Sequence, residues 1–374
     1  MTRTIVDIHV LQTVPPSNLN RDDTGSPKTA WYGGVRRARV SSQAWKRATR
    51  KDFERTVDTI DLGVRSKRVV ELLGDEVRRQ SPDTTEEVAR QLAIDILTAG
   101  GIKLSKPRKG EIEESGYLLF LSHQQVATLA ALALESAAAE AKSDSKAVKA
   151  LLKGKNSIDL AMFGRMVADV TDLNVDASVQ VAHALSVHAV ETEFDYFTAV
   201  DDHKADDAEE DAGAGMIGTV EFNSSTLYRY ATLDVDLLQK NLGDGAPTSQ
   251  AVATFVRSFV RSMPTGKQNT FANRTLPDAV VVSIRSDQSV SYVGAFEEPV
   301  REGQAGGRVT VAAEALARYA KDVADAFGGA PEQTWVVSIG DRTAGLDVLG
   351  ERVPLDELLA GLEQTIAGRL VDAR

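Results

Sequence analysis

The sequence contains no cysteine among its 374 residues. A disulfide framework, a thiolate zinc site and a cysteine nucleophile are therefore excluded. No apolar run approaches the roughly 20 residues that a helix needs to span a bilayer. The N-terminus runs straight into a strand-like segment, without the apolar core that a signal peptide places behind a basic start. We therefore expect a soluble, cytoplasmic protein without a membrane partner.

Several nucleotide-binding and RNA-binding signatures are also absent. The chain has no Walker A loop and no GxGxxG sequence, and it lacks the aromatic RNP1 string with which an ordinary RRM stacks bases. His183 and His188 are five residues apart, which is an awkward spacing for a two-histidine metal site on one helix face. No catalytic constellation stands out. We therefore expect a non-enzymatic protein without a metal or a cofactor.

Positive charge is scarce overall but concentrated in one stretch. The chain carries a net charge of −11, whereas residues 28–55 contain nine Lys and Arg against two acids, a net of +7. The remainder therefore sums to −18. An acidic protein that gathers its cations in one segment has a surface suited to a polyanion.

The order of residues within this basic stretch also suits phosphate. Residues 35–40 alternate as a strand does, and Ser41-Ser42-Gln43 opens a helix predicted over 42–57. Backbone amides at a helix start, with hydroxyls beside them, can bind phosphate oxygens. The helix is predicted to present Lys46 and Arg50 on one face, Arg47 and Lys51 on the next, and Trp45, Ala48 and Phe53 toward the core.

Hydrophobic periodicity predicts an α+β fold. Residues 60–180 are mostly helical in pattern, with a charged loop at 101–116, and no internal repeat is present. Ser122 and Gln125 fit a capping box at the start of a long helix. The predicted strands are 4–12, 190–200, 216–220, 226–233, 279–284 and 335–339, and the predicted helices are 42–57, 64–80, 85–97, 123–142, 249–261, 311–327 and 355–371.

An acidic segment lies between two strand-like stretches. Residues 201–211 contain seven Asp and Glu against one Lys, so 190–228 is predicted to form a long hairpin with a disordered or mobile tip. We expect this tip to point away from phosphate or toward a neighbouring subunit. Its carboxylates could also bind a divalent cation, but they lack the alternating ligand spacing of an EF-hand, so solvated repulsion is the favoured interpretation.

Five groups of residues, in order from residue 1 to about 275, carry a family resemblance. The first joins Asn18-Leu19-Asn20-Arg21-Asp22-Asp23 to the run from Gly33 to Ala48. The others are Phe163-Gly164-Arg165-Met166, Tyr196–Asp202, Tyr228-Arg229-Tyr230-Ala231 and Pro264–Thr270. On these residues the chain resembles the CasC-type backbone subunit of type I-E CRISPR Cascade. The C-terminal hundred residues match less clearly.

The resemblance implies a fold and a function. The fold would be a right hand with a ferredoxin-like, RRM-type palm, an inserted helical fingers domain and a β-hairpin thumb. Several copies would polymerise along a CRISPR RNA without catalysing a reaction, and each thumb would kink the guide and flip one base at a regular interval. The implied partners are CRISPR RNA, further copies of the chain, other Cascade subunits and target DNA through the guide. The implied domains are palm 1–60, fingers 61–180, palm 181–189, thumb 190–228 and palm 229–374.

A guide of arbitrary sequence must be held by its phosphates, sugars and base faces, because contacts to base edges would select a sequence. Cations, hydroxyls and close-approaching glycines meet that requirement. The alternatives are that Lys46 and Arg50 are a solvated helix face and that Gly164-Arg165-Met166 is a helix turn with a buried Met. The predicted RNA-binding residues are Arg21, Lys28, Ser41, Gln43, Lys46, Arg50, Gly164, Arg165 and Met166.

A thumb that kinks RNA needs an apolar wedge to offset the cost of unstacking bases. Phe197, Thr198, Met216 and Ile217 flank the acidic tip and are the candidates, with a small hairpin core as the alternative. Lys146, Lys149 and Lys153 recur at helical spacing and are candidate contacts for target DNA, with a plain solvated helix as the alternative.

The rival hypothesis is a cytosolic enzyme. It would bind a phosphorylated small substrate at the Ser41-Ser42-Gln43 helix start, with Asp7 and His9 as acid–base groups. Against it, nine cations exceed what one small phosphate needs, and a core histidine with a satisfied hydrogen bond is the favoured interpretation of His9.

Overall fold

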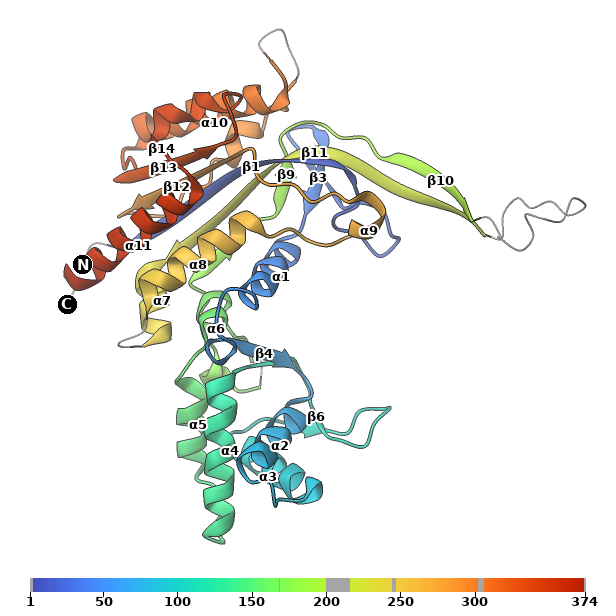
Figure 1. The fold of residues 1–374 in the computed structure, drawn as a ribbon, viewed down its shortest axis with the longest axis vertical. Coiled ribbons are helices and arrows are strands. Elements are labelled where there is room, and N and C mark those ends of the chain that lie inside the picture. Colours follow the sequence, from blue (N-terminus) through green and yellow to red (C-terminus); the bar gives the residue numbers. More distant parts are fainter. Residues whose placement is uncertain (1–2, 168, 200–215, 244–246, 302–305, 373–374) are drawn as a thin grey trace, which may run out of the picture. The chain divides into compact units, whose positions relative to one another are not determined.

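The computed structural model describes residues 3–167, 169–199, 216–243, 247–301 and 306–372 (Figure 1). The protein has the α+β fold that the sequence predicted. The chain divides into two compact units. Unit 1 comprises Met1–Thr49, Val181–Thr232 and Phe255–Thr365, and unit 2 comprises Arg50–Gln180, Leu233–Thr254 and Ile366–Arg374.

Unit 1 is built on a large sheet with the strand order β14-β13-β12-β1-β11-β9-β3-β2. Among the pairs with a described register, only β13 and β14 run parallel. The elements wholly or partly in unit 1 are β1 (Ile5–Ser17), β2 (Thr29–Tyr32), β3 (Val35–Val40), α1 (Ser42–Phe53), β9 (Ala184–Ser186), β10 (Glu193–Ala199), β11 (Met216–Asp234), α8 (Thr248–Arg261), α9 (Gln268–Phe271), β12 (Ala279–Arg285), η3 (Val293–Phe296), α10 (Arg308–Phe327), β13 (Gln333–Ser338), η4 (Ala344–Leu349), β14 (Glu351–Arg352) and α11 (Leu355–Asp372).

Strand β1 lies in the middle of this sheet, and its side chains are buried along most of its length. It continues past the predicted end at residue 12, because Val14 still packs in the core. Its polar side chains are hydrogen-bonded inside. The Tyr230 hydroxyl donates to Asp7 at 2.8 Å, and the Tyr228 hydroxyl lies 2.8 Å from Nδ1 of His9. His9 is thus a core histidine bonded through Nδ1, as the sequence favoured.

Helices cover both faces of the sheet. On one face Leu316 of α10 packs with Val281 and Tyr228 of the strands. On the other, Trp45 of α1 packs with Leu227. Tyr228 and Leu227 are consecutive on β11, and consecutive side chains of a strand point to opposite faces, so the sheet is the middle layer of unit 1. Trp45 and Phe53 are buried as predicted, although α1 ends at Phe53 instead of residue 57.

Arg229, in one of the motifs singled out above, is buried beneath α1. Its guanidinium stacks on Trp45 with its carbon 3.7 Å from the ring centroid, donates to the Gln12 amide oxygen at 2.6 Å, and donates to the carbonyl of Phe259. Burial lowers the pKa of Arg229 to about 9. This arginine therefore joins β1, α1 and α8 inside unit 1 and is not on the surface.

Strand β11 is one uninterrupted strand of 19 residues, where the sequence predicted two. The residues between the two predicted strands stay in the strand, and Asn223 and Ser225 are buried there. The first part of β11 pairs with β10 in a ribbon, from Glu193 opposite Phe222 to Ala199 opposite Met216 (Figure 1). The predicted acidic tip, 201–211, lies outside the described residues.

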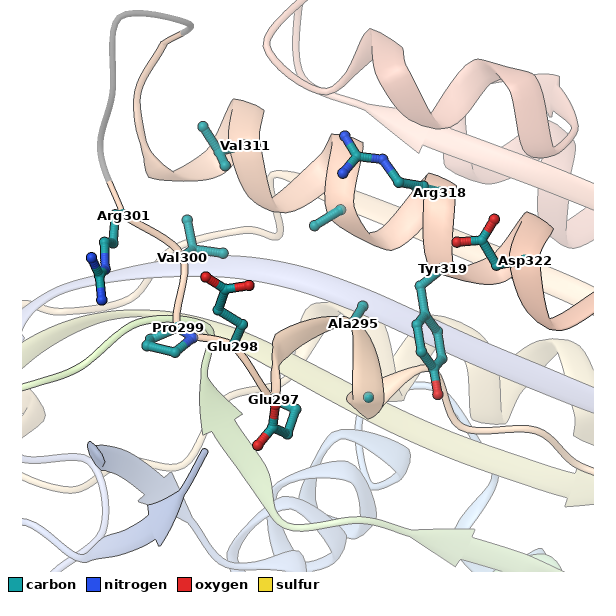
Figure 2. A pocket seen from close by; sticks show the side chains of 12 residues that line it. Ala295, Glu297, Glu298, Pro299, Val300, Arg301, Val311, Arg318, Tyr319 and Asp322 are labelled. Atoms are coloured by element: carbon teal, nitrogen blue, oxygen red, sulfur yellow. The ribbon is translucent and has the colours of Figure 1, made fainter. Parts of the chain in front are cut away.

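A cavity of about 440 Å³ lies between η3 and α10 in unit 1 (Figure 2). Tyr319 and Asp322 of α10 form one wall, and the segment after η3 forms the other with Glu297, Glu298 and Arg301.

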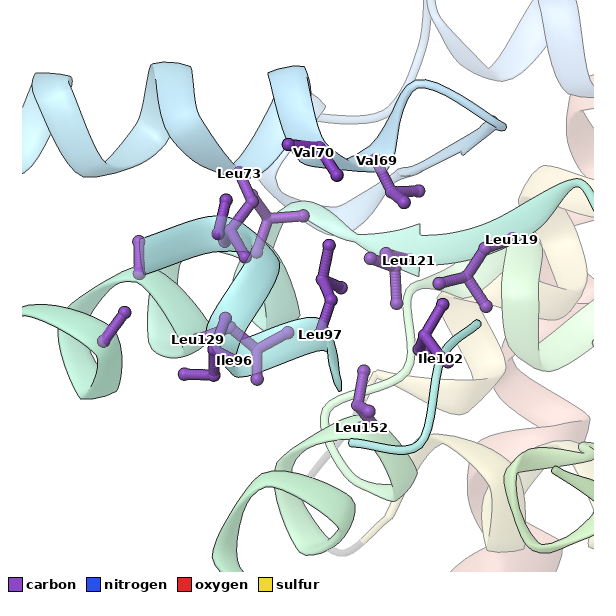
Figure 3. Close-up of a cluster of buried hydrophobic side chains, with 14 of the residues drawn as sticks. Val69, Val70, Leu73, Ile96, Leu97, Ile102, Leu119, Leu121, Leu129 and Leu152 are labelled. Atoms are coloured by element: carbon purple, nitrogen blue, oxygen red, sulfur yellow. The ribbon is translucent and has the colours of Figure 1, made fainter. Parts of the chain in front are cut away.

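Unit 2 is mainly helical, and its core lies among α2, α3, α4 and α5 (Figure 3). Leu73, Leu97, Leu129 and Leu152 each come from a different one of these helices and meet in this core. The elements wholly or partly in unit 2 are η1 (Thr59–Asp61), β4 (Gly63–Ser66), α2 (Val69–Gln80), α3 (Glu86–Ala99), β5 (Leu104–Ser105), β6 (Glu114–Ser115), β7 (Leu119–Ser122), α4 (His123–Ala138), α5 (Ser145–Lys153), α6 (Ile158–Phe163), η2 (Thr171–Leu173), β8 (Val179–Val181) and α7 (Val235–Leu242).

Two predicted helix ends in unit 2 were wrong. The helix predicted from residue 64 begins at Val69, because Gly63–Ser66 pairs with β7 as strand β4. The helix predicted to reach residue 142 ends at Ala138, where Glu140 adopts a positive φ of 51° and breaks the repeat. The capping box was correct: the Ser122 hydroxyl accepts from the Gln125 amide at 2.9 Å, and the Gln125 side chain accepts from the Ser122 amide at 3.0 Å.

Candidate nucleic-acid interface

The loop before β2 is an ordered turn that holds two predicted cations at its base. The Asp22 carboxylate accepts from the amides of Thr24 and Ser26, both at 3.0 Å, and closes the turn. The amide of Lys28 donates to the carbonyl of Asn20 at 2.9 Å, and Arg21 bridges to Pro27. Arg21 is exposed and Lys28 half-exposed, so both can reach a ligand.

The three arginines of β3 differ in their exposure and in their hydrogen-bond partners. Arg36 is exposed, whereas Arg37 is fully buried and donates to four carbonyls, those of Tyr32, Ser186, Phe296 and Glu297. The sequence counted Arg37 with the surface charge, and that was wrong: it ties the β2–β3 hairpin to β9 and η3. Arg39 is half-exposed, and its Nη1 lies 3.2 Å from Nδ1 of His183.

Lys28, Arg39 and His183 lie close together, and no carboxylate of the described residues forms an ion pair with them. Burial first, and then the charges of Arg39 and Lys28, lower the pKa of His183. The imidazole is therefore neutral at neutral pH and can accept from Arg39. Within the described residues neither Lys28 nor Arg39 forms an ion pair. Lys28 is available to an external anion, whereas Arg39 is partly occupied, because its Nε donates to the carbonyl of Thr29 at 3.2 Å.

Helix α1 begins three residues after Arg39 in the sequence. Ser41 is buried at the N-cap, where its amide donates to the Asn20 side chain at 2.9 Å and its hydroxyl makes a long contact of 3.4 Å with the Ala44 amide. Gln43 is exposed in the first turn. Ser41 therefore orders the helix start, and Gln43 is the side chain that is open to a ligand.

Lys46 is a half-buried amine, and burial lowers its pKa. Within the part of the chain that the structure describes, its ammonium forms no ion pair and no hydrogen bond. A partly desolvated cation without a counterion is stabilised by an anion such as phosphate. We use the name basic surface for Arg21, Lys28, Arg36, Arg39, Gln43 and Lys46.

Arg50, the other predicted cation of α1, is held in unit 2. Its Nε donates to Asp159 at 3.3 Å, and its guanidinium carbon lies 4.6 Å from the centroid of the Phe120 ring. Asp159 is nearly inaccessible, and burial raises its pKa despite the charge of Arg50. Arg50 remains 27% exposed, so part of the guanidinium still faces solvent.

The three residues of the Gly164-Arg165-Met166 turn in unit 2 have different roles. Arg165 is buried and donates to the carbonyls of Leu173, Phe120 and Leu152 at 2.7, 3.2 and 2.6 Å. Burial lowers its pKa to about 10. Its guanidinium is thus occupied by the protein and is not available to phosphate at the surface, where the sequence placed it.

Met166, in contrast, is 85% exposed, so the alternative of a buried Met was wrong. Gly164 has a φ of 76°, and a Cβ there would lie 2.7 Å from the carbonyl oxygen of Val175. The glycine therefore permits this turn, Arg165 fixes it, and Met166 is displayed by it.

The candidate DNA-contacting lysines lie on α5 of unit 2. Lys146 and Lys153 are exposed and Lys149 is half-exposed. Lys153 faces Asp172 at 3.8 Å, a separation that gives a solvated pair little energy. Lys146 and Lys149 form no ion pair within the described residues.

The β10–β11 ribbon of unit 1 carries aromatic side chains on both of its faces. Phe194 and Tyr196, two residues apart, are 67% and 64% exposed. Phe197 is on the opposite face and lies over Gly218, where a Cβ would come within 2.4 Å of its ring. Thr198 is exposed. The side chains of Met216 and Ile217 lie outside what the structure describes.

Two further residues were missed from the sequence. Trp31 is 73% exposed and pairs with Arg36 across the β2–β3 hairpin. The available signal was an aromatic pair, Trp31 and Tyr32, directly before the Gly33-Gly34 turn of the basic stretch. Lys267 is half-exposed beside Gly266, which packs so closely that a Cβ would lie 2.6 Å from the carbonyl oxygen of Asn18. Its signal was the Pro264–Thr270 motif.

Two cavities of unit 1 do not suit a small phosphorylated substrate. The one beside Lys28 and Arg39 holds only about 20 Å³, room for about one water. The cavity in Figure 2 is large enough for a ligand, but Glu297, Glu298 and Asp322 outnumber the two arginines that line it. Asp7 and His9, the acid–base pair of the rival hypothesis, are each only 1% exposed. Among the described residues, the cavity at Lys28 and Arg39 is therefore too small for the substrate of the rival hypothesis, and its acid–base pair is buried.

The described residues show neither a membrane-spanning helix nor a metal-binding cluster. No helix there is long and apolar enough to cross a membrane. No group of three or more His, Asp or Glu side chains is arranged to hold a metal ion in the same residues.

The chain matches a protein family and many solved structures. The family described as CT1975-like protein matches residues 6–360. A chain of a "CRISPR RNA-guided surveillance complex, pre-nicking" is 35% identical, with a TM-score of 0.84 and coverage of 96% of this chain and 100% of the other. A chain of another "CRISPR RNA-guided surveillance complex" is 30% identical, with a TM-score of 0.74 and coverage of 96% and 99%. None of the curated proteins compared matches the chain.

Proposed function

Since the chain belongs to the CT1975-like protein family, we propose that it is a backbone subunit of a CRISPR RNA-guided surveillance complex. The two similar solved chains come from complexes of that description. More finely, the subunit is of the CasC type in a type I-E Cascade. Its copies polymerise along the CRISPR RNA in the cytoplasm and display the guide for pairing with target DNA.

The observation that carries this proposal is the half-buried Lys46 amine, which has no counterion among the described residues. Lys28 and Arg39 likewise form no ion pair among the described residues, and the cavity beside these two side chains admits about one water. Several unpaired cations on an open surface match a chain of phosphates better than a single enclosed phosphate. None of these groups reads a base edge in particular, so the grip is independent of guide sequence.

The domain roles follow from the same proposal. Unit 1 supplies the palm, and the mostly helical part of unit 2 supplies the fingers. The β10–β11 ribbon is the thumb, which kinks the guide with apolar side chains near its end, Phe197 and Thr198 among them. Met166, displayed by the Gly164 turn, contacts the guide where a base is unstacked. Lys146, Lys149 and Lys153 approach the target strand.

The subunit acts without catalysis in this proposal. Asp7 and His9 are the only acid–base pair that the sequence suggested, and both are inside the sheet of unit 1. Their contacts with Tyr230 and Tyr228 serve the core. Cutting of the guide or the target is left to other subunits.

The test is RNA binding by the purified chain with two matched double variants. Lys28→Ala with Lys46→Ala removes two cations of the basic surface. Arg47→Ala with Lys51→Ala removes the same charge from the next face of α1, where Lys51 is already paired with Glu54 at 2.7 Å. For RNAs of unrelated sequence, the first variant should bind about tenfold or more weakly at moderate salt, and its log–log salt slope should fall by about 1.4 for two phosphates on a single strand. The control should stay near wild type.

Equal losses in both variants would mean that net charge matters and the basic surface does not. A loss confined to one RNA sequence would contradict a backbone grip. A wild-type chain that ignores every RNA at low salt, and that purifies without nucleic acid, would overturn the function itself.

A further inference from the structure

A short hairpin in unit 2 is not explained by the proposed function. Strands β5 and β6 pair from Leu104 opposite Ser115 to Ser105 opposite Glu114, and residues 106–113 form the connection. The sequence described this region only as a charged loop. Figure 1 shows the loop extending beyond β6, away from α2 and α3 of the same unit.

The base of this hairpin is fixed firmly to unit 2. The amide and hydroxyl of Ser115 both donate to the carbonyl of Lys67, at 3.0 and 3.2 Å. Leu104 and Ile112, one on each limb, pack against the hydrophobic core of Figure 3. Pro107 approaches Gly110 across the turn, where a Cβ on the glycine would lie 3.1 Å from its ring. The conformation of the hairpin is therefore fixed by contacts within the protein and does not depend on a ligand.

The acidic limb of the hairpin is tied down by an arginine. Arg90 of α3 donates to the Glu113 carboxylate at 2.7 Å and to the carbonyl of Glu111 at 2.7 Å. Lys106 also approaches Glu113, at 3.9 Å. The charge of Glu113 is thereby neutralised on the side of the hairpin that faces its own helices.

The cations at the tip and the base of the hairpin, in contrast, are not neutralised by ion pairs with described residues. Arg108 and Lys109 at the tip are exposed, and so is Lys67 at the base. Within the described residues none of these three side chains forms an ion pair. The carboxylate of Glu111 is also exposed near the tip, but Arg108, Lys109 and Lys67 outnumber it, so the hairpin keeps an excess of positive charge that attracts an external polyanion.

We infer that this hairpin binds the phosphate backbone of duplex DNA through Arg108, Lys109 and Lys67. A duplex carries a charge every ~1.7 Å along its axis, twice the density of one strand, so it is the stronger partner for closely spaced cations. A two-stranded β-ribbon also fits the width of the major groove. The contact shares no residue with the basic surface and does not run through guide pairing, so it goes beyond the proposed function.

The test measures binding of a labelled random-sequence DNA duplex to the full chain across a salt series, with and without a saturating unrelated RNA. The variant is Arg108→Ala with Lys109→Ala. The control is Arg318→Ala with Lys321→Ala, two exposed cations of α10 that likewise form no ion pair within the described residues. All four side chains are exposed, so circular dichroism and thermal melting should match wild type. The hairpin variant should lower the log–log slope for the duplex by about 1.8, since each duplex phosphate contributes about 0.9, and should leave RNA binding unchanged.

An unchanged duplex slope in the hairpin variant would overturn the inference. So would an equal fall in the α10 control, or a wild-type chain that binds no duplex. A fall in RNA binding alone would assign the hairpin to RNA and contradict the duplex site. Should wild type bind the duplex but no RNA, the proposed function would fail while the hairpin site would stand.

Discussion

At the scale of single residues, the arginines divide into those that hold the fold and those that face outward. Arg37, Arg165 and Arg229 are all buried, and all three donate to backbone carbonyls. Each lies in a motif on which the family resemblance rested. A guanidinium has five donors in a fixed fork, so it can satisfy several carbonyls at once inside a protein as readily as it binds phosphate outside. Sequence alone does not separate these two uses.

The contrast between Arg165 and Met166 gives a first prediction. Arg165→Ala leaves three buried carbonyls without their donor and should cost about 3–5 kcal/mol of unfolding free energy. Met166→Ala removes an exposed side chain and should stay within about 0.5 kcal/mol of wild type. Urea unfolding checks both values. If Arg165→Ala were as stable as wild type, the guanidinium would not be fixing the turn.

A second prediction concerns acid stability and His9. Burial, with a smaller contribution from the charge of Arg285, lowers the pKa of His9 from its ordinary 6.5 to about 3. His9 is therefore neutral in the fold, while the unfolded chain takes up the proton below pH 6.5. The stability of the wild type should fall by about 1.4 kcal/mol per pH unit from this source as the pH drops from 6.5 toward 3.

The measurement is urea unfolding from pH 7.5 to pH 4 of wild type and His9→Gln. Glutamine keeps a hydrogen-bonding group near Tyr228 but does not titrate, so the acid-dependent loss should be shallower in the variant. Burial raises the pKa of Asp7, which acts in the opposite direction, but Asp7 is present in both proteins and cancels in the difference. Parallel pH profiles would show that His9 is not the source.

At the scale of elements, the β10–β11 ribbon depends on one glycine. The Phe197 ring lies over Gly218 on the paired strand, in the space that a Cβ would occupy. Gly218→Ala should displace the ring and destabilise the ribbon, and Phe197→Ala should leave the glycine uncovered. Because the double variant removes the clash, its cost should be smaller than the sum of the two single costs by about 1 kcal/mol. Hydrogen exchange of the amides in 193–199 reports each step, and additive effects would contradict the contact.

The elements also show which parts of the fold follow from local sequence. The capping box at Ser122 and the inward Trp45 and Phe53 were predictable, because caps and helical periodicity act within a few residues. Strand β4 was not, because residues 63–66 become a strand only through pairing with β7, more than fifty residues later. Likewise Phe197 became a candidate wedge from its place near the tip, whereas its contact with Gly218 depends on strand register. Long-range pairing overrides local pattern in each case.

At the scale of the whole molecule, unit 2 gathers most of its core from one continuous stretch. The clustered apolar side chains of Figure 3 all fall between Val69 and Leu173. A fragment spanning Arg50–Gln180 should therefore be helical and unfold cooperatively in urea. It should be less stable than the full chain, because Asn241 would no longer donate to the carbonyls of Ala161 and Asp176. A gradual, non-cooperative unfolding transition, followed by circular dichroism, would contradict the prediction that the fragment folds on its own.

The pairing of β1 with β12 has a consequence for synthesis on the ribosome. Ile5 to Leu11 pair with Arg285 to Ala279, which are made some 270 residues later. At roughly 5–20 residues per second, about 15 to 55 seconds pass before strand β1 can pair with β12. The core of unit 2 is complete long before that. The nascent chain thus carries an unpaired apolar strand while the helical core of unit 2 has already folded, and the sheet of unit 1 is completed only afterwards.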